Sequence, residues 1–126
     1  HAIYQVFGIS QIHTSDAVRC YDTVIGLTNT LKIEPVITSK LSEYTFEKNK
    51  DKSLDYALEL AETSRSTGAT ILLCSHNPVL PRMLERVTKK SDVDLPENKL
   101  KPGDAWVVFL GKKKCLQIDV VPAPIV

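Results

Sequence analysis

Residues 69–78 read ATILLCSHNP: a continuous apolar run followed by a serine, a histidine, an asparagine and a proline. Uninterrupted apolar runs of this length are typical of strands that are buried on both faces in a parallel sheet. We therefore predict a central strand from Ala69 to Cys74. A helix is predicted to start near Pro78, because a proline in the first helical turn removes no intrahelical hydrogen bond.

Helix and strand patterns alternate ahead of this stretch. Apolar residues recur at helical spacing after Asp16 and again from Leu54 to Ala61. The first predicted elements are the tail of a helix over residues 1–7, closed by Gly8, and a strand over 9–14. A helix is then predicted to open at Asp16, with Ser15 as its N-cap. A brief edge strand over 35–37, a mostly irregular loop over 38–53 and a helix that ends before Gly68 follow.

The rest of the chain predicts a helix over residues 79–87, a loop over 89–103, and two strands over 106–110 and 115–121 that form a hairpin. Alternating strands and helices indicate the α/β class. We expect a mostly parallel sheet with helices on both faces and a C-terminal hairpin. At 126 residues, the chain has the length of a single domain spanning residues 1–126.

Composition excludes several classes of function. Lys and Arg number 16 against 15 Asp and Glu, so the net charge of +1 predicts neither a nucleic-acid nor a membrane partner. The sparse, odd number of cysteines argues against a disulfide framework and predicts a reducing, cytoplasmic location. No metal site and no cofactor are expected, because metal-ligand spacing is absent among Cys20, Cys74, Cys115, His1, His13 and His76.

Two strand ends carry polar residues suited to phosphate. Ser15 and Arg19 place a hydroxyl and a guanidinium at the start of a helix, where free N–H groups favour anions. The alternative is an ordinary cap followed by a surface arginine. At the other strand end, His76 and Asn77 could bind a phosphoryl group lying on the next helix, whereas a histidine that only caps that helix is the alternative.

The motifs at these strand ends resemble those of the histidine phosphatase superfamily. Residues 14–23 (TSDAVRCYDT) look like its Ser-Ser-Pro-Ala-x-Arg-x-x-x-Thr segment, with Asp16 in place of the proline. Residues 74–80 (CSHNPVL) look like its second catalytic histidine motif, and Leu41-Ser42-Glu43 resembles the Leu-x-Glu that often carries the acid. The resemblance covers about residues 7–84.

A finer resemblance is to fusion proteins with an N-terminal Nudix (MutT-type) domain and a C-terminal histidine phosphatase domain. Phrases similar to Arg19-Cys20-x-x-Thr23, to residues 74–81 and to residues 101–105 (KPGDA) recur in those proteins. This likeness implies a bacterial-type protein associated with a Nudix domain.

The resemblance implies a phosphoglycerate mutase-like fold and metal-independent hydrolysis through a phosphohistidine intermediate. Carried over by position, Arg19 is a pocket arginine, His76 is the second histidine and Glu43 is the candidate acid; Ser15 and Asn77 join them as phosphate-binding residues. The implied substrates are a phosphorylated small molecule, a nucleotide or a phosphohistidine protein.

The family's nucleophile lies in an early Arg-His motif, further upstream of Ser15 than the 14 residues that precede it. We therefore expect the first strand and the nucleophile to be missing and the fragment to be inactive. Without that first strand, the edge of the strand over residues 69–74 is open. We expect this edge to be covered by a second copy of the chain, in a homo-oligomer, or by the missing N-terminal segment. A non-catalytic phospho-ligand-binding or interaction module is the alternative, and an unrelated flavodoxin-like binding domain is a third.

Overall fold

The structure, a computed structural model, describes residues 8–76, 78–89, 91, 93–95, 105–111 and 115–121. The predicted helix tail over residues 1–7, the hairpin turn at 112–114 and most of the predicted loop over 89–103 lie outside this part. The described elements are β1 (Ile9–Ser15), α2 (Val18–Leu31), β2 (Val36–Thr38), the 3-10 helix η1 (Ser39–Leu41), α3 (Glu43–Lys48), α4 (Lys50–Thr67), β3 (Thr70–Cys74), α5 (Leu80–Val87), β4 (Ala105–Leu110) and β5 (Cys115–Val121).

The main sheet has three parallel strands in the order β2-β1-β3. The predicted strands over 9–14, 35–37 and 69–74 are therefore present. The prediction that the last of these is the central strand is wrong for the described sheet, because β1 takes the middle position and β3 an edge. Burial follows this order: Ile12, Thr14 and Ser15 of β1 have no exposed surface, whereas every residue of β3 is partly exposed.

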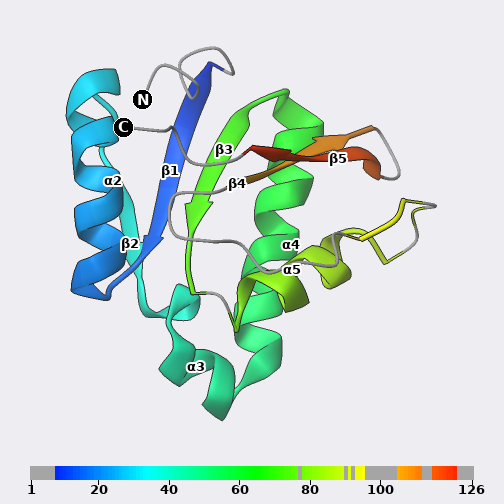
Figure 1. The fold of residues 1–126 in the computed structure, drawn as a ribbon, viewed down its shortest axis with the longest axis horizontal. Helices are drawn as coiled ribbons and strands as arrows, with labels where there is room; N and C mark the ends of the chain where they lie inside the picture. Colours follow the sequence, from blue (N-terminus) through cyan, green and yellow to red (C-terminus); the bar gives the residue numbers. More distant parts are fainter. Residues whose placement is uncertain are drawn as a thin grey trace.

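Helices cover both faces of the sheet, as Figure 1 shows for α2 on one side and α4 on the other. Neighbouring residues of β3 alternate between the two faces. Leu72 packs with Ile12 and with Val24 of α2, whereas Leu73 packs against a cluster that includes Leu54 of α4. The predicted mixed α/β architecture thus rests on two apolar clusters, one on each face.

The C-terminal strands β4 and β5 form the predicted antiparallel hairpin, in which Trp106 pairs with Val120. This second sheet contacts α4. Cys115 at the start of β5 is buried, and its backbone N–H donates a hydrogen bond to Ser91 Oγ at 2.7 Å.

The prediction of a loop over residues 38–53 is wrong, because this polar segment contains η1, α3 and the first turn of α4. Each of the three begins with its own side-chain cap. Thr38 accepts a hydrogen bond from the N–H of Lys40, Ser42 from Thr45 and Asn49 from Lys52. Such caps satisfy the free N–H groups of short helices, so one fully buried apolar residue, Leu41, suffices to anchor the segment.

The helix predicted to open at Asp16 begins at Val18 instead, and Ala17 takes the N-cap position without a side-chain cap. Ser15 is not the predicted cap of this helix. It is the last residue of β1, and its Oγ accepts a hydrogen bond from the N–H of Ala17 at 3.2 Å. At the other end of the fold, α4 closes at Gly68 as predicted, with the positive φ of 74° that glycine tolerates best.

Candidate functional site

The candidate site lies where β1 and β3 end. Because these strands are parallel and Thr14 pairs with Cys74, the residues that follow them emerge at the same edge of the sheet. Ser15 is the final residue of β1, and His76 follows β3 by two positions. The first residue of α3, Glu43, completes the group.

Two polar contacts join the three side chains in a row. Ser15 Oγ lies 3.0 Å from His76 Nε2, and His76 Nδ1 lies 3.3 Å from Glu43 Oε1. When Nδ1 carries its proton toward Glu43, Nε2 is left to accept the Ser15 hydroxyl proton. The carboxylate and the hydroxyl thus orient the ring from its two nitrogens.

The three side chains differ in how much of their surface solvent reaches. Ser15 is fully buried and His76 is 6% exposed, whereas the Glu43 side chain is 40% exposed. Proton exchange with solvent is therefore open at the carboxylate end and closed at the serine end.

Backbone contacts hold the two loops of the site together. Ser75 Oγ donates a hydrogen bond to the carbonyl of Leu41 at 2.6 Å, which ties the end of β3 to the segment that carries Glu43. The carbonyl of His76 accepts hydrogen bonds from the N–H groups of Val79 and Leu80, both at 2.9 Å. The loop between β3 and α5 is thereby a tight turn that keeps the imidazole in place.

Two cysteines adjoin the histidine, which sequence reasoning did not foresee. Cys20, in the first turn of α2, has its Sγ 3.9 Å from His76 Nε2 and donates to the Ser75 carbonyl at 3.6 Å. Cys74 is in contact with Cys20, and burial, followed by the charge of Cys20, raises the pKa of the Cys74 thiol to about 12. The Cys74 thiol is therefore protonated at neutral pH.

The sequence-predicted residues fall into two groups. The structure brings Ser15, His76 and Glu43 together. The backbone of Arg19 lies in the first turn of α2, next to Cys20, but its side chain is outside the described atoms. Asn77 is also outside the described residues.

The order hydroxyl, imidazole, carboxylate is also that of serine hydrolases. Two features distinguish this site from theirs. Ser15 has no exposed surface, and its Oγ already accepts the N–H of Ala17. A buried hydroxyl that accepts a hydrogen bond is poorly placed to attack a substrate, so Ser15 is better suited to orient His76.

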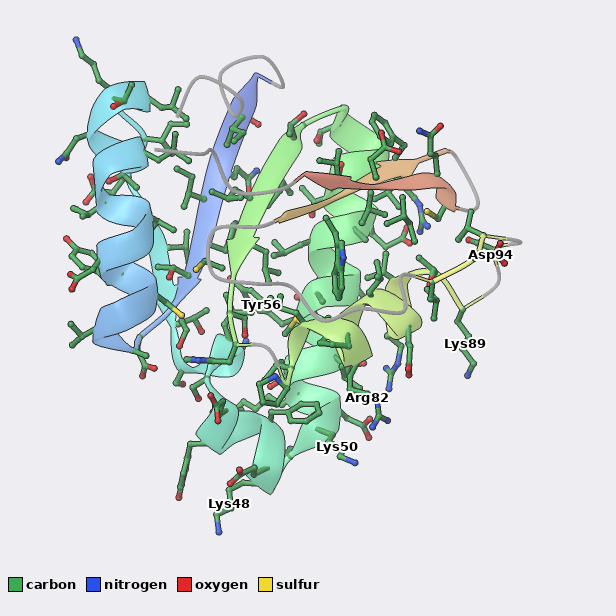
Figure 2. All side chains as sticks on the ribbon, viewed as in Figure 1. Lys48, Lys50, Tyr56, Arg82, Lys89 and Asp94 are labelled. Atoms are coloured by element: carbon green, nitrogen blue, oxygen red, sulfur yellow. The ribbon has the colours of Figure 1, made fainter. Side chains whose placement is uncertain are left out.

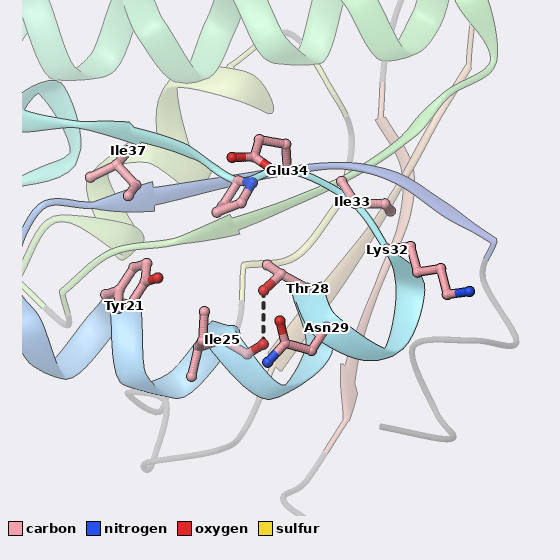
Figure 3. Close-up of a pocket in the computed structure, with 9 residues that line it drawn as sticks. Tyr21, Ile25, Thr28, Asn29, Lys32, Ile33, Glu34 and Ile37 are labelled. Atoms are coloured by element: carbon pink, nitrogen blue, oxygen red, sulfur yellow. Dashed lines mark hydrogen bonds between the residues drawn. The ribbon is translucent and has the colours of Figure 1, made fainter.

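A separate pocket of about 490 Å³ lies between α2 and β2 (Figure 3). Tyr21 and Ile25 of α2 line it together with Ile37 of β2. None of the residues that line this pocket belongs to the candidate site.

His13 lies two residues before Ser15 and is a buried strand residue, as predicted. Its Nδ1 is 2.6 Å from the hydroxyl of Tyr56, and its Nε2 is 3.0 Å from Gln11 Oε1. Tyr56 reaches the sheet from α4 (Figure 2). Burial lowers the pKa of His13 from its usual value.

This lowered pKa predicts a pH-dependent stability. The unfolded chain, in which histidine has a pKa of about 6.5, binds the proton more readily than the folded chain does. The contribution of His13 is therefore complete above that pH, and it is lost as the pH falls toward the folded pKa. Urea unfolding from pH 7.5 to pH 5 should show a smaller loss of stability for His13→Gln than for the native chain. Equal losses in the two proteins would contradict this prediction.

Comparison of the chain with models of known protein families gives no match. Within the described residues, no group of three or more His, Cys, Asp or Glu side chains is placed to hold a metal ion. No helix in the described part of the chain is both long and apolar enough to cross a membrane. The function is accordingly inferred from the chemistry of the site.

Proposed function

We propose that this chain is the larger, C-terminal part of a histidine-phosphatase domain with a phosphoglycerate mutase-like fold. The observation that carries the proposal is the chain Ser15–His76–Glu43 at the carboxyl ends of two parallel strands, beside the start of α2. These are the positions that the resemblance assigns to phosphate binding, to the second histidine and to the acid. Charge-bearing donors at strand ends and helix starts suit a phosphoryl group.

Each residue has a distinct role in this proposal. His76 stabilises charge on the phosphoryl oxygens, and Ser15 orients its ring. Glu43 is partly exposed, so it can take up a proton from solvent and, as a carboxylic acid, donate that proton to the leaving group. Arg19 is the pocket arginine, offering two parallel N–H donors to phosphate oxygens. No step requires a metal ion.

The nucleophile is a second histidine in an upstream segment with an Arg-His-Gly or Arg-His-Ala motif. It attacks phosphorus, the leaving oxygen departs with the proton from Glu43, and water then hydrolyses the phosphohistidine. The upstream strand that precedes this histidine adds to the open side of β3, which pairs only with β1 among the described residues. A second copy of the chain could cover the same edge.

The proposed substrates are phosphorylated small molecules, nucleotides or phosphohistidine proteins. The proposed setting is a bacterial-type, Nudix-associated protein of the cytoplasm. Residues that select among these substrates lie in loops, which vary most between proteins that share a fold.

The test compares the 126-residue chain with a longer chain that includes the upstream Arg-His motif. Both are assayed on an aryl phosphate in the presence of EDTA, and an acid-labile phosphoenzyme is trapped from labelled substrate. We expect turnover and trapped phosphate only from the longer chain, because the shorter one lacks the nucleophile. Metal-dependent turnover, or turnover by the short chain that requires both His76 and Arg19, would contradict the proposal.

A non-catalytic phospho-ligand-binding or interaction module is the second candidate. The full burial of Ser15 and near-complete burial of His76 favour it, because a substrate must reach groups with little exposed surface. Calorimetric titration with phosphate and vanadate separates the two functions. Binding that depends on His76, without turnover or trapped phosphate in the longer chain, would indicate the binding module.

A further inference from the structure

We infer that Cys20 and Cys74 form an oxidisable dithiol pair, and that closing their disulfide changes the surroundings of His76. This inference does not rest on the proposed phosphatase activity. It assigns a modification site to two thiols that the phosphate chemistry leaves unused.

Position brings the pair together. Cys74 is the last residue of β3, and Cys20 lies in the first turn of α2, on the face of the sheet that this helix covers. Cys74 Sγ lies 3.9 Å from the carbonyl oxygen of Cys20, and Cys20 Sγ lies 3.6 Å from the carbonyl oxygen of Ser75, the residue after Cys74. Each thiol thus lies against the backbone beside the other, and side-chain rotation is the movement that the narrow geometry of a disulfide would require.

The two thiols differ in reactivity. Cys20 Sγ is 3.9 Å from His76 Nε2, and this nitrogen is a base whenever the other ring nitrogen holds the proton toward Glu43. Within the described part of the chain, Cys74 contacts no comparable base, and burial raises its pKa to about 12, which keeps the thiol protonated. Cys20 is therefore the attacking thiol and Cys74 the resolving one. Cys20 itself is buried, and the partly exposed Cys74 beside it is the side from which a small oxidant can approach the pair.

A peroxide is the oxidant class that completes the chemistry. The Cys20 thiolate attacks one peroxide oxygen, the O–O bond breaks, and the departing hydroxide takes up the proton held by His76, which leaves a sulfenic acid and one water. Cys74 then attacks the Cys20 sulfur, and the expelled hydroxide takes the Cys74 proton as a second water. Two thiols and one hydrogen peroxide thus give one disulfide and two waters.

Formation of the disulfide would change contacts within the candidate site. It turns Cys20 Sγ away from His76 Nε2 and from the carbonyl of Ser75, two contacts of the reduced form. It also links the first turn of α2 covalently to β3. The NMR signals of the His76 imidazole should therefore change when the Cys20–Cys74 disulfide forms.

The test uses stoichiometric hydrogen peroxide on the reduced, folded chain, followed by alkylation in denaturant and peptide mapping. We expect a Cys20–Cys74 disulfide that dithiothreitol reverses. Cys115→Ser is the matched control, because Cys115 lies on β5 and its thiol contacts the carbonyl of Gln117. This variant should form the same disulfide, whereas Cys20→Ser and Cys74→Ser should not.

Two further measurements probe the link to His76. His76→Gln should slow disulfide formation by about tenfold or more, since it removes the proton acceptor. In Cys115→Ser protein, the imidazole nitrogen signals of His76 in ¹H–¹⁵N spectra should shift on oxidation, while those of His13 stay in place. Oxidation that stops at a Cys20 sulfinic acid, or that pairs either thiol with Cys115, would overturn the proposal, as would unchanged His76 signals. The peptide map of the native chain decides the pairing even if a variant fails to fold.

Discussion

His76→Ala, made in the longer chain that includes the upstream motif, is expected to lower turnover of an aryl phosphate by about 10²- to 10⁴-fold. The ring is the buried centre of the site, held between Ser15 and Glu43. Its loss removes an imidazole from the position where the resemblance places the phosphoryl oxygens. Steady-state kinetics at saturating substrate measure the effect, and the fall should be in kcat.

A matched control keeps this prediction specific to the site. His13→Gln replaces the other buried histidine of the same sheet, which bonds to Tyr56 and Gln11, and should leave turnover unchanged. Ser15→Ala should have a smaller effect than His76→Ala, because Ser15 acts through the ring. Glu43→Gln should lower turnover, because a glutamine side chain cannot donate a proton to the leaving group. An active His76→Ala enzyme would refute the role given to His76.

Leu41→Ala is expected to destabilise the chain by about 2–5 kcal/mol, the range for truncating a buried leucine. Leu41 has no exposed surface and belongs to the cluster that joins η1 to α4 and α5. The surrounding residues are Leu54, Ala57, Val79 and Met83. Because these come from rigid helices, they should collapse only partly into the space that the leucine leaves. Urea unfolding at neutral pH measures the loss.

The effect of Leu41→Ala should extend to the candidate site. The Leu41 carbonyl accepts the Ser75 hydroxyl, and Glu43 lies two residues further on. A loosened η1 segment should therefore shift the imidazole signals of His76. Val18→Ala is the control, since Val18 is 74% exposed, and it should change stability by no more than about 0.5 kcal/mol. A loss below about 1 kcal/mol for Leu41→Ala would show that this cluster does not hold the segment.

Local patterns predicted most of the elements. The apolar run at residues 69–74 became β3, the alternation near the C-terminus became the β4-β5 hairpin, and Gly68 ended α4. These features follow from neighbouring residues, because strand and helix periods and a glycine at positive φ are local properties.

The polar segment over residues 38–53 was misread for a physical reason. Charged residues there suggested solvent, but its short helices depend on caps and on contact with distant residues. Leu41 alone among residues 38–42 is buried, and Phe46 is only partly so, too few to mark a helix by periodicity. Ser15 was misread for a similar reason. Serine is a common N-cap residue, but the partner of the Ser15 hydroxyl is His76, which is distant in the sequence.

By itself, the sequence indicated that Ser15 and His76 lie near the ends of two strands, and parallel strands of one sheet present such residues at a common edge. Only the tertiary structure decided which atoms meet there: His76 Nδ1 with Glu43, and Cys20 Sγ with His76 Nε2. Glu43 and Cys20 are separated from His76 by 33 and 56 positions, the differences 76 − 43 and 76 − 20 in residue number. Contacts over such separations depend on how α2 and α3 pack against the sheet, which local propensity does not encode.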